Sequence, residues 1–203
     1  MTTCAHARAA PETRSHYVPV IRFDAVVDET SVDQTLQAMK AVVAGGAEAI
    51  ILELNTSGGG VGAGFRLSKA IENSKVPVVC VVDGEALSMG AYLLESCSTR
   101  IMTRRSSLMF HQPAIRGTVG GTREEFQNIA ELLRTLESGM IEHLVARMNI
   151  SAADMQKKIE GGKQWWMTFQ EALETGAVDC AVGSTKEVAQ ELRKNPQVSK
   201  ICR

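Results

Sequence analysis

A short, nearly continuous apolar segment at residues 76–82, with polar residues on both sides, most constrains the fold of this chain. Such a run is typical of a parallel strand that is buried on both faces of a sheet. Two further strands are predicted at residues 18–23 and 49–54. Helices are predicted after each of them, at residues 31–43 and 63–73, from their apolar spacing and flanking turn residues. This alternation predicts an α/β fold with a parallel sheet and right-handed crossovers.

The second half of the chain is predicted to contain one long helix, at about residues 122–149. Its apolar residues form one stripe, and a helix this long is expected to project from a small domain and to pack against a neighbour. Shorter elements are predicted around it: helices at 88–96, 151–160 and 184–195, and strands at 100–103 and 108–111. Residues 1–17 are polar and aperiodic, so they are interpreted as a mobile N-terminal arm before a single domain at residues 18–203.

Composition excludes several classes of function. The formal net charge of −1 gives no electrostatic reason to bind nucleic acid, and no apolar run is long enough to cross a membrane. The cysteines show no CxxC spacing, so neither a zinc site nor a disulfide framework is expected: Cys4, Cys80, Cys97, Cys180, Cys202. This usage favours a reducing, cytoplasmic location. An exported form stays open if a signal peptide once preceded residues 7–9, which resemble the end of a cleavage site.

Three short motifs together indicate acyl transfer. Ser88 follows the buried strand and precedes a predicted helix, and His111 ends a later strand, 23 residues further on. A glycine-rich stretch at residues 55–60 follows another strand. A serine nucleophile, a histidine base, and backbone N–H groups of Gly59 and Met89 as an oxyanion hole are what such chemistry needs. The alternative interpretation of Ser88 is a simple N-cap of the helix.

These motifs resemble the Clp-type serine peptidase family, within the wider ClpP/crotonase superfamily. Its Asn-x-Pro-Gly-Gly loop matches residues 55–59, with Ser57 in place of proline, and its Ala-Ser-Met-Gly-Ala elbow matches residues 87–91. Its His-Gln-Pro motif matches residues 111–113, and its Glu-Ala-x-x-x-Gly-x-x-Asp tail matches residues 171–179. The resemblance runs from about residue 18 to residue 182.

The resemblance implies a βαβ superhelix whose long helix serves as a handle between stacked rings. It implies a serine endopeptidase that cleaves peptides or unfolded proteins through a Ser88–His111 acyl-enzyme, without cofactor or metal. Gly58, Gln112 and Pro113 would then contact the substrate, and the segment after His111 resembles the strand that pairs with its extended backbone. The implied assembly is a homo-oligomeric ring, a heptamer or tetradecamer. An AAA+ unfoldase is a further implied partner, although the arm that forms the family's axial pore is not recognisable here.

One departure bears on activity. Counting back from Glu171, the family's third catalytic residue, an aspartate, is replaced by Gln164. An amide orients a histidine but supplies no full charge to stabilise the imidazolium. Glu160 or Asp154 are alternative partners. Trp165 replaces a basic residue that helps rings to stack, and Trp165 and Trp166 are expected to cover the end of the sheet.

Two other functions therefore stay open. Gln164 supports a catalytically weak or inactive, ClpR-like ring subunit, although Ser88 and His111 are both retained. A crotonase-type acyl-CoA enzyme would share the fold, but such enzymes typically place acidic residues over the thioester, and no such pair of glutamates is apparent.

Overall fold

The computed structural model describes residues 15–197 and 201–202. Most of the predicted N-terminal arm, residues 1–14, lies outside the described residues, so the division into an arm and a single domain stays a prediction.

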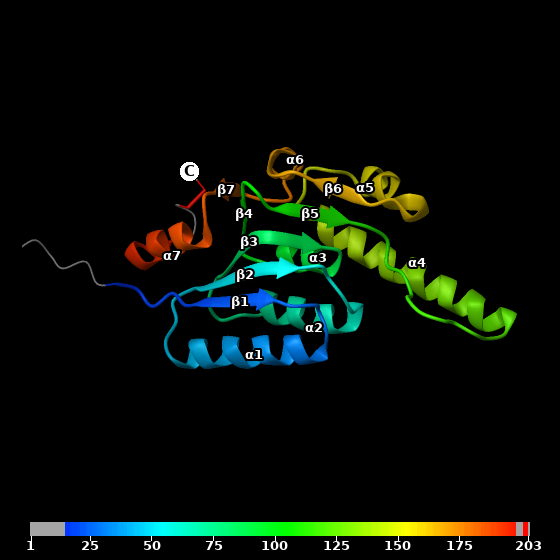
Figure 1. Cartoon of the computed structure of the whole chain (residues 1–203), viewed down its shortest axis with the longest axis horizontal. Helices are drawn as coiled ribbons and strands as arrows, with labels where there is room; N and C mark the ends of the chain where they lie inside the picture. Colours follow the sequence, from blue (N-terminus) through cyan, green and yellow to red (C-terminus); the bar gives the residue numbers. More distant parts are fainter. Residues whose placement is uncertain (1–14, 198–200, 203) are drawn as a thin grey trace, which may run out of the picture.

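The described residues form a seven-stranded sheet with helices on both faces (Figure 1). The strand order is β1-β2-β3-β4-β7, with β5 paired to β3 and β6 paired to β5. Every pairing is parallel except that of β5 with β6. The strands are β1 (Val20–Asp24), β2 (Ile50–Thr56), β3 (Val78–Leu87), β4 (Thr99–Thr103), β5 (Ser107–Phe110), β6 (Trp165–Met167) and β7 (Cys180–Val182). The predicted α/β class with its parallel sheet is confirmed.

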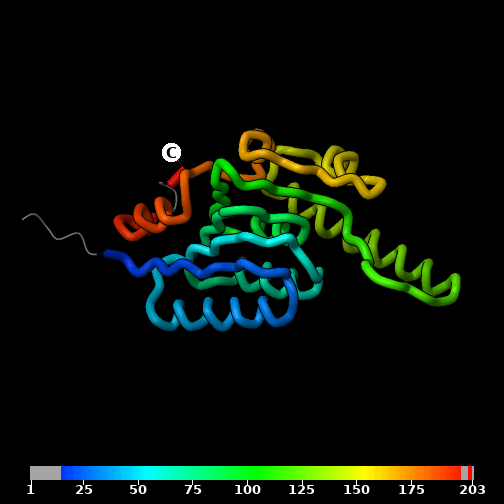
Figure 2. Tube along the Cα trace, viewed as in Figure 1, coloured from blue at the N-terminus to red at the C-terminus, as the bar shows by residue number. Residues whose placement is uncertain are grey.

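The helices alternate with the strands along most of the chain, as the Cα trace shows (Figure 2). They are α1 (Glu29–Ala44), α2 (Val61–Glu72), α3 (Met89–Glu95), α4 (Arg123–Val145), α5 (Ala152–Ile159), α6 (Phe169–Glu174) and α7 (Thr185–Lys194), with a short 3₁₀ turn, η1 (Glu160–Gly162). Each helix predicted from apolar spacing is present, with its bounds shifted by a few residues at most.

Strand β3 explains the apolar run that dominates the sequence. Its residues alternate between two cores: Val78, Cys80 and Val82 pack on the face that α1 to α4 cover, whereas Val79 and Val81 pack on the face that α7 covers. All five side chains are at most 2% exposed. A strand covered on both faces needs apolar residues at every position, and the period of two is therefore lost from its sequence.

Helix α4 projects from the body, as its predicted length required (Figure 1). It begins in a capping box in which Thr122 and Glu125 satisfy each other's backbone N–H groups. Only its C-terminal half is anchored, by the buried residues Ile141 and Leu144. Phe126 and Leu132, nearer the free end, are 46% and 53% exposed. The handle-like helix expected from the resemblance is thus present.

The predictions were incomplete for residues 165–182. Strands β6 and β7 contain three residues each, too few for a periodic pattern, and both exist because they pair with a neighbouring strand. The two tryptophans lie within β6 rather than over the sheet's end: Trp165 packs against Phe110 with ring centroids 6.0 Å apart, and Trp166 is 50% exposed. Helix α6 begins in a capping box at Thr168 that was also missed.

The prediction that no cysteines are paired is wrong. Disulfides join Cys80 to Cys97 and Cys180 to Cys202. The spacing of 17 residues in the first pair carried no motif. Cys97 comes beside β3 because α3 packs on the sheet and because the next residues pair with β3, with the Ser98 N–H donating to the Val78 carbonyl. Disulfides persist mainly in oxidising compartments, so cysteine usage no longer argues for a reducing cytosol.

We expect loss of the first disulfide to be costly. Replacing Cys80 and Cys97 together by alanine should lower the free energy of unfolding by about 3 kcal/mol, because a loop of this length loses its constraint in the unfolded chain. Urea unfolding of both proteins without reductant measures the difference. The double variant Cys180→Ala, Cys202→Ala is the matched control, because it removes the other disulfide and keeps the Cys80–Cys97 bond. Equal stability of the Cys80, Cys97 variant and the parent would contradict the cross-link.

Candidate active site

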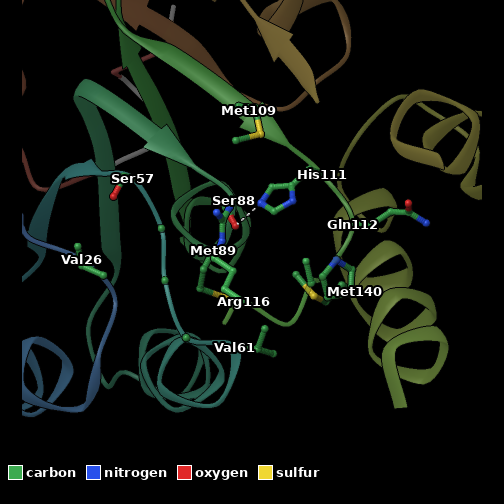
Figure 3. Close-up of a pocket in the computed structure, with 15 residues that line it drawn as sticks. Val26, Ser57, Val61, Ser88, Met89, Met109, His111, Gln112, Arg116 and Met140 are labelled. Carbon is green, nitrogen blue, oxygen red and sulfur yellow. Dashed lines mark hydrogen bonds between the residues drawn. The ribbon is translucent and has the colours of Figure 1, made fainter. Parts of the chain in front are cut away.

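Ser88 is the single residue between the end of β3 and the start of α3, and its backbone conformation is strained. Its φ of 55° and ψ of −116° make it the one non-glycine residue with positive φ among the residues described. Such a conformation costs of the order of 1–3 kcal/mol and is common at functional sites. Ser88 occupies the N-cap position of α3, and its carbonyl accepts from the Tyr92 N–H over 3.2 Å, but its side chain makes no capping hydrogen bond. Instead, its Oγ lies 2.7 Å from His111 Nε2 (Figure 3).

Strand pairing brings His111 to this turn. β5 lies parallel to β3 with Met109 opposite Leu87, and the Ser88 N–H donates to the Met109 carbonyl over 2.8 Å. His111, one residue beyond β5, therefore arrives beside the serine. Burial lowers the pKa of His111, and the positive charge of Arg116 lowers it further, while a hydrogen bond with the Gln112 backbone raises it in part. The imidazole is thus neutral at pH 7 and able to accept a proton.

Residues 58–60, called the glycine wall below, line the site on the other side from His111. Val27 donates to the Gly58 carbonyl over 2.8 Å and accepts from the Gly60 N–H over 2.7 Å, so this bridge leaves the Gly59 N–H unused. A Cβ on Gly59 would lie 2.2 Å from the Val27 carbonyl oxygen, and one on Gly58 would lie 2.5 Å from the Leu87 carbonyl oxygen. Only glycine fits either position, because backbone approaches backbone on both sides.

These residues line one pocket of about 570 Å³ (Figure 3). The structure brings into it all but one of the residues predicted for the site: Gly58, Gly59, Ser88, Met89, His111, Gln112 and Pro113. The Met89 N–H lies at the start of α3, where the helix adds positive potential next to the serine. Aliphatic and thioether groups of Val26, Val61 and Met140 complete the wall.

Gln164 is the residue that the structure leaves outside. Its side chain is exposed, and its Oε1 accepts from the Trp166 indole N–H over 3.2 Å. The two alternatives are engaged elsewhere: Asp154 bonds to Ser151 and Lys157, and Glu160 lies 3.8 Å from Lys163. In the described part of the chain, no carboxylate forms a hydrogen bond or an ion pair with His111.

Two further residues near the site were missed. The Gln112 amide donates to both carboxylate oxygens of Glu137 on α4, at 2.9 and 3.0 Å, and accepts from the Gly162 N–H at 3.1 Å. Gln112 therefore ties the projecting helix to the segment before β6. Arg116, five residues after His111, also lines the pocket. Neither Glu137 nor Arg116 belongs to a motif, so the sequence carried no signal for them.

Across the residues described, no helix has the length and apolar character that a membrane crossing needs.

Comparison with known proteins agrees with the fold and the motifs. A family model described as Clp protease matches residues 18–185. The chain is 33% identical over 142 residues to the ATP-dependent Clp protease proteolytic subunit 1 of Protochlamydia amoebophila, covering 68% of each chain. It is 34% identical over 134 residues to the protein of the same name from Chlamydia muridarum, covering 64% of this chain and 68% of that one. A Streptococcus suis ATP-dependent Clp protease proteolytic subunit is 33% identical over 141 residues, which cover 68% of this chain and 70% of that protein. The chain belongs to the Clp protease family.

Proposed function

We propose that this chain is a serine endopeptidase that cleaves peptides and unfolded proteins through an acyl-enzyme. The observation that carries the proposal is the 2.7 Å contact between Ser88 Oγ and His111 Nε2 in a pocket bounded by the glycine wall. A serine at a strained strand-to-helix turn, with a neutral histidine in hydrogen-bond range, is the geometry of an activated nucleophile.

In the proposed reaction, Ser88 Oγ attacks the scissile carbonyl carbon while its proton moves to His111 Nε2. The N–H groups of Gly59 and Met89 stabilise the oxyanion of the tetrahedral intermediate. His111 then gives the proton to the leaving amine as the C–N bond breaks. Water, deprotonated by His111, hydrolyses the ester and regenerates Ser88. No metal or cofactor enters this scheme.

The expected rate depends on the carboxylate that His111 is without in the described part of the chain. In Ser-His-Asp proteases the aspartate orients the histidine and stabilises the imidazolium, and its replacement by an amide costs about 10⁴-fold in kcat. We therefore expect this enzyme to be slow. The same observation favours a second candidate, the ClpR-like ring subunit with little or no activity. Nothing in the site favours the crotonase-type acyl-CoA enzyme.

Assembly belongs to the same proposal. The relatives are named as proteolytic subunits of ATP-dependent proteases, and α4 exposes Phe126 and Leu132 on its projecting half. We propose that this apolar surface packs against other copies in a homo-oligomeric ring, a heptamer or tetradecamer, which an AAA+ unfoldase supplies with substrate. A cytoplasmic location, or export if a signal peptide is present, stays a prediction.

Fluorophosphonate labelling tests the proposal directly. One adduct on the purified chain, mapped by peptide mass to Ser88 and lost in His111→Ala, is the expected result. A well-folded protein that gives no adduct would favour the ClpR-like subunit. An adduct on another serine would remove Ser88 as the nucleophile.

The pH dependence of hydrolysis should report on His111. Because burial and Arg116 lower the pKa of this residue, kcat/KM should hold its plateau to below pH 6.5 and fall only as His111 becomes protonated. In Arg116→Gln the imidazolium loses a repulsive neighbour, the pKa of His111 rises, and the acidic limb should move to higher pH. A shift to lower pH, or none, would show that the limb belongs to another group.

Restoring the family's aspartate should not restore its rate. Because the Gln164 side chain contacts Trp166 and lies outside the pocket, Gln164→Asp is expected to change kcat by less than about threefold. Steady-state hydrolysis of a fluorogenic peptide measures it, with Gln164→Asn as the control of similar size. A tenfold gain for the aspartate alone would mean that this segment turns towards His111 in the working enzyme.

A further inference from the structure

The pocket around Ser88 contains a single charged side chain. Among the fifteen residues that line it, the others are apolar, glycine, hydroxyl, amide or the neutral histidine, and none is acidic. The charge is that of Arg116, which lies on the loop between β5 and α4 (Figure 3). A substrate held against Ser88 therefore meets one positive group and no negative group from the residues that the structure describes.

Arg116 also lacks an internal partner in the described part of the chain. No ion pair or side-chain hydrogen bond involves Arg116, whereas Arg22, Arg66, Arg100 and Arg134 pair with carboxylates. Arg104, Arg105, Arg123 and Arg193 are also without a carboxylate partner there, but none of them lines the pocket. Its charge nevertheless reaches the site, because it acts electrostatically on the His111 imidazole. The guanidinium is thus close to the reacting groups and available to a ligand.

We infer that Arg116 makes this site select substrates that carry a carboxylate beside the scissile bond. The inference rests on the proposed peptidase function and adds a substrate class to it. A guanidinium binds a carboxylate through two parallel N–H donors, and this geometry is specific as well as strong. Arg116 is exposed, and Val26, Val61 and Met140 line the same pocket. A bound substrate that excludes water from these groups would strengthen the attraction.

Two sources could supply this carboxylate: an acidic side chain within a longer peptide, or the free C-terminus of a short one. The first would make the enzyme an endopeptidase with acidic preference, and the second would direct it to the ends of peptides. Both use the same contact, so the peptides tested must separate them.

A binding experiment tests the inference without requiring turnover. Fluorescein-labelled decapeptides with amidated C-termini, each with one glutamate that moves along the sequence, are titrated against the Ser88→Ala protein by anisotropy. Matched peptides carry glutamine instead, and one further peptide has no glutamate but a free C-terminal carboxylate. At one position, or for the free C-terminus, the carboxylate should tighten Kd about fivefold or more over its neutral counterpart, and 0.5 M salt should reduce this ratio.

Variants assign the effect to one residue. In Ser88→Ala, Arg116→Gln the ratio should fall below about twofold. In Ser88→Ala, Arg116→Glu the glutamine peptide should bind better than the glutamate one. Ser88→Ala, Arg105→Gln, which removes the same charge outside this pocket, should keep the full ratio. Equal Kd values for glutamate and glutamine peptides at every position, with no gain from a free C-terminus, would overturn the inference. An equal loss in the Arg105 variant would do the same.

Failure of the inference differs from failure of the proposed function. If Ser88 reacts with fluorophosphonate but the Kd ratios are all near one, the peptidase proposal is supported and the proposed selectivity for carboxylates is rejected. If no adduct forms but the ratio depends on Arg116, the pocket binds carboxylate-bearing peptides without cleaving them, and the peptidase proposal falls.

Discussion

The Ser88→Ala variant is expected to lose at least about 100-fold in peptide hydrolysis. Removing the serine of a complete triad costs about 10⁶-fold in kcat, and about 10⁴ of that depends on the triad's carboxylate. His111 has no such partner among the residues that the structure describes. The remaining difference is the contribution of the Ser88–His111 pair itself. Hydrolysis of a fluorogenic peptide measures it, against the background rate without enzyme.

The strained turn supplies the control. Alanine keeps the positive φ of 55° without the hydroxyl, whereas Ser88→Gly removes the steric strain as well. Both variants should be equally inactive, but the glycine variant should be more stable than the alanine variant by about 1 kcal/mol in urea unfolding. Parental activity in either variant would exclude Ser88 as the nucleophile. Equal stability of the two would mean that the turn carries little strain.

Gly59→Ala should be nearly as damaging, by a different route. Its Cβ would lie 2.2 Å from the Val27 carbonyl oxygen, so the bridge between these segments has to open. The Gly59 N–H then moves away from the oxyanion, and the loss of one such donor typically costs 10²–10³ in kcat. We expect a loss of kcat of about this size together with lower stability.

Gly62→Ala is the matched control for this variant. Gly62 lies three residues further on, in the first turn of α2, and no atom comes within 4 Å of its added Cβ. Alanine there should keep activity and raise stability by roughly 0.5–1 kcal/mol, because it lowers the entropy of the unfolded chain. If Gly59→Ala hydrolyses peptide as fast as Gly62→Ala does, the glycine wall is not an oxyanion hole.

Prediction from the sequence succeeded where one segment's own pattern was sufficient. The run of apolar residues in β3 and the stripe on α4 are local properties, so the α/β fold and the projecting helix could be expected. The serine, histidine and glycine motifs were also recognisable locally. Their convergence in one pocket followed from the rule that parallel strands present their carboxyl ends at one edge of the sheet.

Features that depend on contacts between distant segments could not be predicted from the sequence. β6 exists only as the partner of β5. The Cys80–Cys97 pair depends on the packing of α3 on the sheet and on the pairing of β4 with β3. Counting along the chain placed Gln164 at the third catalytic position, yet the path of the backbone after η1 turns its side chain to Trp166.

The sequence by itself determined which residues are candidates for the proposed chemistry, because the proposed nucleophile, base and glycine wall follow from residue type and from the ends of strands. Only the tertiary structure decided which charges surround them. It left His111 without a carboxylate in the described part of the chain and set Arg116 in the pocket, because loops carry no period from which the position of a side chain can be calculated.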